Sequence, residues 1–236
     1  MTYRLTTIGF DADDTLWQNE QFFRMTEAHF ADLLADHAEK DHLTERLLDA
    51  EKRNLGHYGF GIKGFTLSMI ETAIEVTDGR VPAQTIAKIL AAGREMLRHP
   101  VDILPHVADT SDALAGRYRL VLITKGDLFD QERKLAASGL GDHFDAIEIV
   151  SDKNEATYAR IFSGAGHDPA TSMMIGNSLK SDVLPALQAG SWGVYVPHDL
   201  TWTYEHAEKP TGNPRFREMP DLSHLLGFVE EIETGR

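Results

Sequence analysis

The sequence predicts an α/β protein with a doubly wound parallel sheet and an all-helical domain inserted into it. Three observations predict this fold. A short apolar run, Leu5–Phe10, ends at an aspartate and has the length and composition of a buried strand. Residues 21–97 show only helical periodicity, and after Pro105 strand-like and helix-like segments alternate. Strands that alternate with helices of about ten residues are typical of a parallel sheet with helices on both faces.

The alternating part of the chain divides into elements in order. Each apolar, β-branched run is expected to be a buried strand, and each amphipathic segment a helix that covers the sheet. The expected elements are helix 107–115, strand 119–123, helix 128–137, strand 146–150, helix 155–163, strand 172–175, helix 180–189 and strand 193–196. The segment 197–236, with several prolines and glycines, carries no predicted element.

These segments divide the chain into two domains. Residues 1–17 and 100–236 are expected to form the α/β domain, and residues 18–99 the helical one. Turn-forming residues mark the boundaries, near residues 17–20 and 100–105. A domain inserted after the first strand is expected over the carboxyl ends of the strands, where open α/β sheets bind ligands. The helical domain is therefore a candidate lid.

The composition limits the classes of function. The 236 residues include 37 acidic and 23 basic side chains, a formal net charge of −14. This charge disfavours nucleic-acid binding, which depends on lysine and arginine, but it allows a local pocket for a small phosphorylated ligand. The absence of cysteine excludes disulfides, thiolate nucleophiles and thiolate metal sites. With no long apolar run and no signal-peptide pattern, the protein is expected in the cytoplasm and not in a membrane.

Three carboxylates follow the first expected strand. Asp11, Asp13 and Asp14 lie within four residues directly after Phe10. Carboxylates this close repel one another and raise one another's pKa unless a cation neutralises them. Carboxylate oxygens at the end of a buried strand are also ligands that Mg²⁺ prefers. The alternative is an acidic loop that caps the next segment.

The other expected strands end in residues that suit the same chemistry. Thr124 and Gly126 follow the second strand just before a helix, whose N-terminus and dipole favour an anion. Lys153 follows the third strand, and Asn177 and Asp182 follow the fourth across a turn. The strand ends thus offer a nucleophile-type carboxylate, a hydroxyl, an ammonium and oxygen ligands for a metal at one edge of the sheet.

Four motifs carry a resemblance to a known family. They are FDADDTLW at 10–17, LVLITKG at 120–126, SDKN at 151–154 and IGNSLKSDVLPALQAG at 175–190. In this order and spacing the chain resembles the haloacid dehalogenase superfamily, in its phosphatase branch with a helical cap of the C1 type. The resemblance implies a Rossmann-like core with an inserted cap. The fourth motif departs from the commonest pattern, which has aspartate where this chain has Asn177.

The resemblance also implies roles for the residues in these motifs. Asp11 looks like the nucleophile that forms an aspartyl-phosphate, and Asp13 like the general acid and base. Lys153 is expected to neutralise Asp11 and the phosphoryl group. The expected phosphoryl-binding groups are Thr124 and the amides of Lys125 and Gly126. The implied cofactor is Mg²⁺, and its expected ligands are Asp11, Asp13 through its carbonyl oxygen, Asn177 and Asp182.

The helical domain contains one glycine-rich segment, residues 56–64. Four glycines in nine residues make a pliant loop that can approach a ligand closely. Lys63 in this loop is expected to bind the substrate, because a capped hydrolase needs a specificity loop. The alternative is a flexible turn with a solvated lysine.

The leading prediction is an Mg²⁺-dependent phosphatase that acts on a small phosphorylated metabolite. A 2-haloacid dehalogenase of the same superfamily would use Asp11 without a metal, but such enzymes lack the second acidic residue, here Asp13. A phosphomutase would use the same pair of aspartates, and a phosphonatase would use Lys63 to form a Schiff base. A phospho-receiver-like binding protein has similar residues but lacks a long helical insertion.

Overall fold

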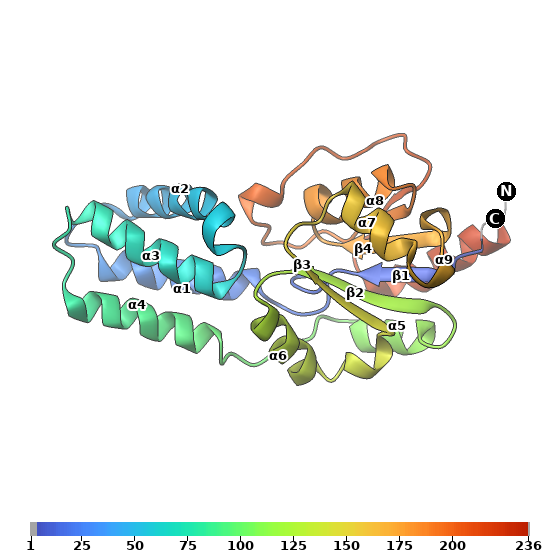
Figure 1. The fold of residues 1–236 in the computed structure, drawn as a ribbon, viewed down its shortest axis with the longest axis horizontal. Helices are drawn as coiled ribbons and strands as arrows, with labels where there is room; N and C mark the ends of the chain where they lie inside the picture. Colours follow the sequence, from blue (N-terminus) through green and yellow to red (C-terminus); the bar gives the residue numbers. More distant parts are fainter. Residues whose placement is uncertain (1–3, 236) are drawn as a thin grey trace. The chain divides into compact units, whose positions relative to one another are not determined.

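The chain forms two compact units in the computed structural model, which describes residues 4–235 (Figure 1). The first unit runs to Glu20, resumes over Val101–Lys125 and continues from Gln131 onward. The second unit comprises Gln21–Pro100 together with the short segment Gly126–Asp130. Each unit has a hydrophobic core of its own.

One parallel sheet forms the centre of the first unit. Its strands are β1 Thr7–Phe10, β2 Arg119–Lys125, β3 Ala146–Val150, β4 Ser172–Gly176, β5 Trp192–Tyr195 and β6 Phe216–Glu218. In the described part of the chain these six strands have the order β3-β2-β1-β4-β5-β6, which confirms the predicted α/β fold. The fully buried β1 pairs with both β2 and β4. The strand order therefore reverses at β1, where doubly wound sheets bind their ligands.

Helices cover both faces of this sheet (Figure 1). They are α5 Val107–Leu114, α6 Leu128–Ser138, α7 Glu155–Phe162, α8 Leu184–Gln188 and α9 Leu225–Thr234. In β2, Leu120 and Leu122 belong to the core that also holds residues of α5, α6 and α9. Val121 and Ile123 of the same strand belong to a second core with residues of α7 and α8. The alternation follows from the two-residue period of a strand.

The segment after β4 differs from the single helix 180–189 that the sequence predicts. A π-helical turn, Leu179–Val183, precedes the short helix α8. Pro185 near the start of α8 has no N–H to donate to the carbonyl oxygen of Ser181, four residues earlier. The buried hydroxyl of Tyr158 donates to that oxygen instead, at 3.0 Å. A residue of α7 thus stabilises the irregular turn.

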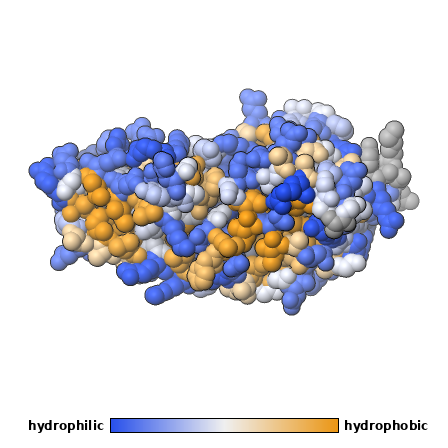
Figure 2. Space-filling view, in the orientation of Figure 1, coloured by the Kyte–Doolittle hydropathy of each residue, from blue (hydrophilic) through white to orange (hydrophobic). Residues whose placement is uncertain are grey.

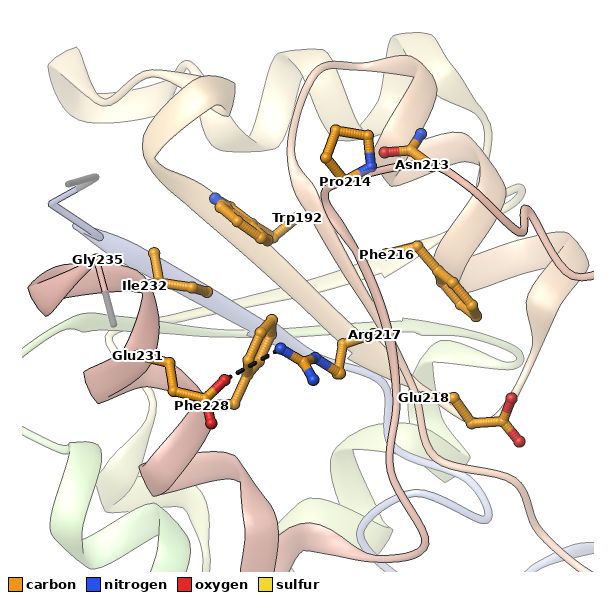
Figure 3. A pocket seen from close by; sticks show the side chains of 10 residues that line it. All are labelled: Trp192, Asn213, Pro214, Phe216, Arg217, Glu218, Phe228, Glu231, Ile232 and Gly235. Carbon is orange, nitrogen blue, oxygen red and sulfur yellow. Dashed lines mark hydrogen bonds and ion pairs between the residues drawn. The ribbon is translucent and has the colours of Figure 1, made fainter. Parts of the chain in front are cut away.

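The C-terminal part of the first unit contains elements that the sequence did not predict. Strand β6 extends the sheet, and α9 packs on the core that α5 also covers. A pocket of about 390 Å³ opens beside β5, β6 and α9 (Figure 3). In this pocket Arg217 pairs with Glu231 at 3.0 Å and lies over the ring of Phe228. The residues that line the pocket include none of the predicted site residues.

Helices alone form the regular structure of the second unit in the described part of the chain. They are α1 Glu20–Leu33, which starts at the last residue of the first unit, α2 Lys40–Tyr58, α3 Ile62–Val76 and α4 Ala83–Met96. Their common core includes Phe30, Leu43, Leu47, Phe65, Met69 and Ile89. Leu67 and Ile74 of α3 and Leu90 of α4 stay 41–44% exposed, and Figure 2 shows apolar surface over these helices. No described helix is long and apolar enough to cross a membrane.

Candidate active site

The candidate residues of the first unit lie where β1, β2, β3 and β4 end. Phe10 pairs with Leu122 of β2 and with Ile175 of β4, so the chain leaves all three strands at the same edge of the sheet. The backbone N–H of Asp11 still donates to the carbonyl oxygen of Ile175, at 2.9 Å. Thr124, near the end of β2, is buried. The sheet register therefore positions these residues before any side-chain contact is made.

A buried lysine joins two of the predicted carboxylates. Lys153 Nζ donates to Asp11 Oδ1 and, at 2.7 Å, to Asp182 Oδ1. All three side chains are at least nine-tenths buried. Asp182 also packs directly on Gly176, where any Cβ would overlap its carboxylate. The structure thus brings together a predicted nucleophile, a predicted cation and a predicted metal ligand from three different strand ends.

One ammonium between two carboxylates leaves an excess of negative charge in this cluster. Burial raises the pKa of Asp11 to about 7, and the neighbouring Asp182 adds to this effect although Lys153 opposes it. Burial alone would lower the pKa of Lys153, but the two carboxylates outweigh it and raise that pKa. The lysine is therefore charged, and its single positive charge does not balance the two carboxylates.

Two oxygen atoms and one end of the Asn177 side-chain amide converge beside Asp11. One end of the Asn177 side-chain amide lies 3.2 Å from Asp11 Oδ2 and 3.3 Å from the carbonyl oxygen of Asp13. Thr15 donates to Asp11 Oδ2 at 3.0 Å and accepts from the Asn177 backbone N–H at 3.1 Å. The Thr15 hydroxyl thus joins the loop after β1 to the loop after β4. With the amide nitrogen at that end, Asn177 donates to both oxygens; with the amide oxygen there, three oxygens face one point.

This set of oxygens fits a hard cation. Mg²⁺ prefers carboxylate, carbonyl and amide oxygens, and often keeps several waters. Among residues 4–235 no group of three acidic or histidine side chains could by itself hold a metal ion. A metal at this site would therefore need other kinds of ligand as well. The expected ligands are of mixed kinds, because one is a backbone carbonyl and one is an amide. The donor set at Asp11, Asp13 and Asn177 therefore fits the implied Mg²⁺.

Asp13 has very different surroundings from Asp11. Its Oδ1 accepts from Lys134 Nζ at 2.6 Å and from the indole N–H of Trp17 at 2.7 Å. Its Oδ2 accepts from Gln131 Nε2 at 2.9 Å. Burial alone would raise the pKa of Asp13, but Lys134 and the hydrogen bonds from Gln131 and Trp17 hold it below its ordinary value. These three protein donors thus take the place of water around the Asp13 carboxylate and favour its anionic form.

Two of these partners, Gln131 and Lys134, are functional candidates that sequence reasoning missed. They lie on α6, more than 115 residues from Asp13 along the chain, so no spacing pattern indicates the contact. Trp17, the last residue of the first motif, is the third partner of Asp13. It is fully buried, and its indole N–H binds Asp13.

Lys125 was expected to bind the substrate through its backbone amide. Its side chain makes a different contact: Nζ donates to Ser181 Oγ at 2.8 Å and to Glu205 Oε1 at 2.7 Å. Glu205 comes from the C-terminal segment and was not a candidate from sequence. The ammonium of Lys125 is therefore part of a buried polar cluster at the sheet edge.

Lys63 lies in the second unit, near the start of α3. Its Nζ donates to both carboxylate oxygens of Asp127, at 2.9 Å each, and its side chain is 55% exposed. Gly126, beside Asp127, has a φ of 136°, a conformation that favours glycine. The pair with Lys63 is the main reason that the pKa of Asp127 lies below its ordinary value.

Comparison with known proteins places the chain in a family. Residues 5–190 match haloacid dehalogenase-like hydrolases. A haloacid dehalogenase-like family hydrolase from Xanthomonas campestris has 43% identity and a TM-score of 0.88, over 99% of this chain and 94% of that one. The glyceraldehyde 3-phosphate phosphatase of Methanothermobacter thermautotrophicus is 26% identical over 87% of this chain and 92% of its own length. The 2-haloacid dehalogenase of Pseudomonas syringae shares the fold, with 22% identity and a TM-score of 0.62 over 96% of this chain and 99% of that one. With its parallel sheet and its residues at the strand ends, this chain belongs to the haloacid dehalogenase-like hydrolase family.

Proposed function

We propose that the protein is an Mg²⁺-dependent phosphatase that hydrolyses a small phosphorylated metabolite through an aspartyl-phosphate on Asp11. The observation that carries the proposal is the buried Asp11 carboxylate, held by Lys153 on one oxygen and facing the Asn177 amide with the other. Asp13, a second and partly buried carboxylate, follows two residues later. The similarity to a glyceraldehyde 3-phosphate phosphatase supports a phosphorylated substrate of small size.

Asp11 begins the reaction as a nucleophile. Its carboxylate oxygen forms a bond to phosphorus while the bond from phosphorus to the leaving oxygen breaks. Lys153, bound to Asp11, offsets negative charge that would otherwise repel the phosphate. The hydroxyl of Thr124 and the amides of Lys125 and Gly126, which follow it in the chain, bind the phosphoryl oxygens. The product of this step is an acyl phosphate on Asp11.

Asp13 moves the protons. In its protonated form it gives a proton to the leaving alkoxide, and as an anion it takes a proton from the water that attacks the acyl phosphate. The hydrogen bonds from Lys134, Gln131 and Trp17 favour the anion, which is the form that the second step needs. The first step needs Asp13 released from Lys134. Hydrolysis regenerates the Asp11 carboxylate and inorganic phosphate.

The chain's own oxygens would hold the metal. The expected ligands are the Asp11 carboxylate, the Asp13 carbonyl oxygen, the Asn177 amide oxygen and Asp182. Asp182 and Asp11 both accept a hydrogen bond from Lys153. When bound, Mg²⁺ supplies positive charge that stabilises the transferring phosphoryl group. Asn177 is neutral where the commonest family pattern has a carboxylate, so this site carries one negative charge fewer.

Dehalogenation is the alternative within the family, and Asp13 argues against it. A halide leaves carbon without a proton, so a second carboxylate has no task in that reaction. An alkoxide leaving group needs the proton that Asp13 supplies. The three hydrogen bonds that fix the Asp13 carboxylate support the phosphatase.

The proposal is tested by turnover of p-nitrophenyl phosphate and of 2-chloropropionate by the purified protein. We expect phosphate release with Mg²⁺, none with EDTA, and poor recovery with Ca²⁺, which prefers more ligands at longer distances. Chloride release in EDTA without phosphate release would contradict the proposal. A panel of sugar phosphates, nucleotides, phosphoglycolate and glyceraldehyde 3-phosphate then ranks candidate substrates by kcat/KM.

Lys63 is proposed as a substrate-binding residue, and Lys63→Ala tests it. We expect kcat/KM to fall roughly ten- to a hundredfold for the best metabolite, as for loss of a charge-assisted contact, and much less for p-nitrophenyl phosphate. Equal losses with both substrates would assign Lys63 to the phosphoryl group itself. No loss with either would leave it as an exposed partner of Asp127.

A further inference from the structure

A carboxylate from the C-terminal segment lies in a polar cluster at the edge of the sheet. Glu205, at the end of the 3₁₀ turn Thr203–Glu205, accepts from Lys125 Nζ at 2.7 Å. It also accepts from Ser178 Oγ at 2.6 Å and from Ser181 Oγ at 2.5 Å. The side chains of Lys125 and Glu205 are only 12% and 13% exposed. A charged pair this buried requires such additional hydrogen bonds to be stable.

The two serines belong to the loop that carries the predicted metal ligands. Ser178 directly follows Asn177, and its backbone N–H donates to Asp182 Oδ2 at 2.9 Å. Its hydroxyl oxygen also accepts from the Ser181 backbone N–H at 2.9 Å, which starts the π-helical turn. Glu205 therefore holds the loop at two points between Asn177 and Asp182.

The lysine in the cluster belongs to the predicted phosphate-binding segment. Lys125 directly follows Thr124, and its carbonyl oxygen accepts from Thr124 Oγ1 at 3.2 Å and from Gln131 Nε2 at 2.9 Å. Gln131 is also a donor to Asp13. Because Lys125 Nζ binds both Glu205 and Ser181, the end of β2 is connected to the loop after β4 through one carboxylate. The ammonium of Lys125 keeps the pKa of Glu205 below its ordinary value, although burial alone would raise it.

We propose that Glu205 is a positioning residue that holds the metal-binding loop against the phosphate-binding end of β2. Its side chain accepts hydrogen bonds from Lys125, Ser178 and Ser181, and not from any expected metal ligand or reacting group. It acts through Ser178 and Ser181 on Asn177 and Asp182, and through Lys125 on Thr124. The affinity of the site for Mg²⁺ and the rate of phosphoryl transfer therefore depend on Glu205. This inference rests on the proposed function, and part of its test is independent of that function.

The first test compares Glu205→Gln with Glu208→Gln, an exposed carboxylate three residues later. Calorimetric titration of the folded protein with MgCl₂ is expected to show about ten- to a hundredfold weaker binding in Glu205→Gln, the usual effect of removing an outer partner of a metal ligand. Turnover of p-nitrophenyl phosphate at low Mg²⁺ falls with it, and high Mg²⁺ restores part of the rate. Glu208→Gln behaves as wild type. Unchanged Mg²⁺ affinity in Glu205→Gln would overturn the proposal, because a purely structural residue lowers stability without changing binding by the folded protein.

The second test separates this inference from the proposed function. In metal-free protein, hydrogen exchange of the backbone N–H groups of Ser178, Ser181 and Asp182 is expected to be at least about tenfold faster in Glu205→Gln, since their loop is less restrained. Faster exchange in a protein that binds no Mg²⁺ and cleaves no phosphoester would refute the proposed function and keep the positioning role. Unchanged exchange would refute the positioning role itself.

A double variant covers the case in which Glu205→Gln does not fold because Lys125 is left buried without its partner. Lys125→Met/Glu205→Leu removes both charges and the oxygen acceptor, and replacing a buried pair with apolar residues of similar volume usually preserves folding. The serines still lose their carboxylate acceptor. We therefore expect the same faster exchange and weaker Mg²⁺ binding, and wild-type values for both would overturn the proposal.

Discussion

Asp11 and Asp13 are two residues apart, both are largely buried, and their pKa values move in opposite directions. The pKa of Asp11 rises to about 7, whereas the pKa of Asp13 falls below its ordinary value. The difference lies in how many carboxylates share each cation. Lys153 is divided between Asp11 and Asp182, but Asp13 receives Lys134 and two neutral donors. Burial alone therefore does not decide the charge of a carboxyl group; the balance of donors around it does.

The surroundings of Asp11 and Asp13 differ in whether a further cation would stabilise them. The group around Asp11 has an excess of negative charge and gains stability from an added cation. The group around Asp13 is already complete, since three donors serve its two oxygens. The first arrangement suits a nucleophile that works next to a metal, and the second suits a base that must be an anion.

The largest expected effect comes from Asp11→Asn. An amide cannot form the aspartyl-phosphate, so kcat for p-nitrophenyl phosphate should fall by at least about 10⁴-fold. The measurement is steady-state phosphate release, with circular dichroism to check that the fold persists. Wild-type turnover by the variant, with deamidation excluded by mass spectrometry, would remove Asp11 from the mechanism.

Asp13→Asn is expected to have a smaller effect that depends on the leaving group. General acid and base catalysis contributes about 10²–10⁴-fold, and the acid part matters less for p-nitrophenolate, which leaves without help. The loss in kcat should therefore be greater for an alkyl phosphate than for p-nitrophenyl phosphate. Equal losses for the two substrates would assign Asp13 to the base step alone.

Lys134→Met tests whether a single cation distinguishes Asp13 from Asp11. The change leaves a partly buried carboxylate with two neutral donors, and we expect the free energy of unfolding to fall by about 1–3 kcal/mol, less than for a fully buried pair. Urea unfolding measures this cost. Lys88→Met, at an exposed position of α4, is the control and should be nearly neutral. If both variants unfold alike, Lys134 does not stabilise Asp13.

The last expected effect is a pH dependence of stability in metal-free protein. The pKa of Asp11 is raised in the folded state, so between about pH 4 and 7 Asp11 keeps its proton in the folded protein but has lost it in the unfolded chain. The contribution of Asp11 to stability is therefore greatest below pH 4 and is lost as the pH rises to 7. Asp11→Asn should gain about 2–4 kcal/mol relative to wild type between these pH values, measured by urea unfolding in EDTA. A difference that does not change with pH would show that Lys153 keeps Asp11 ionised throughout.

The parts of the fold that local patterns encode could be predicted from the sequence. Leu5–Phe10 and 119–123 are apolar, β-branched runs with one possible role, and the structure has β1 and β2 there. Strand β6 was missed because its three residues, Phe216–Glu218, are polar or partly exposed and make an edge strand. The irregular turn before α8 depends on the Tyr158 hydroxyl, which lies on another helix. Contacts with residues so far away along the chain cannot be predicted from a short stretch of sequence.

The same limit applies to the candidate site. The motifs place Asp11, Lys153 and Asp182 at strand ends, and the parallel register brings strand ends together. Gln131 and Lys134 are ordinary polar residues on the exposed-looking side of a helical pattern, and Glu205 lies in a segment with no periodicity. Their contacts with the site are tertiary contacts between distant parts of the chain. Motifs thus predict the reacting groups, but not the residues that hold them in place.

The central position of β1 has a consequence for how the protein is made. β1 is synthesised before the other strands, yet its first partner, β2, begins only at Arg119. Residues 21–100 take roughly 4–16 s to translate at about 5–20 residues per second. The helices in that stretch make contacts local in sequence, which form far faster than this. We therefore expect the helices to pack while the apolar segment that becomes β1 still lacks a partner on both sides, which exposes that segment to aggregation during synthesis.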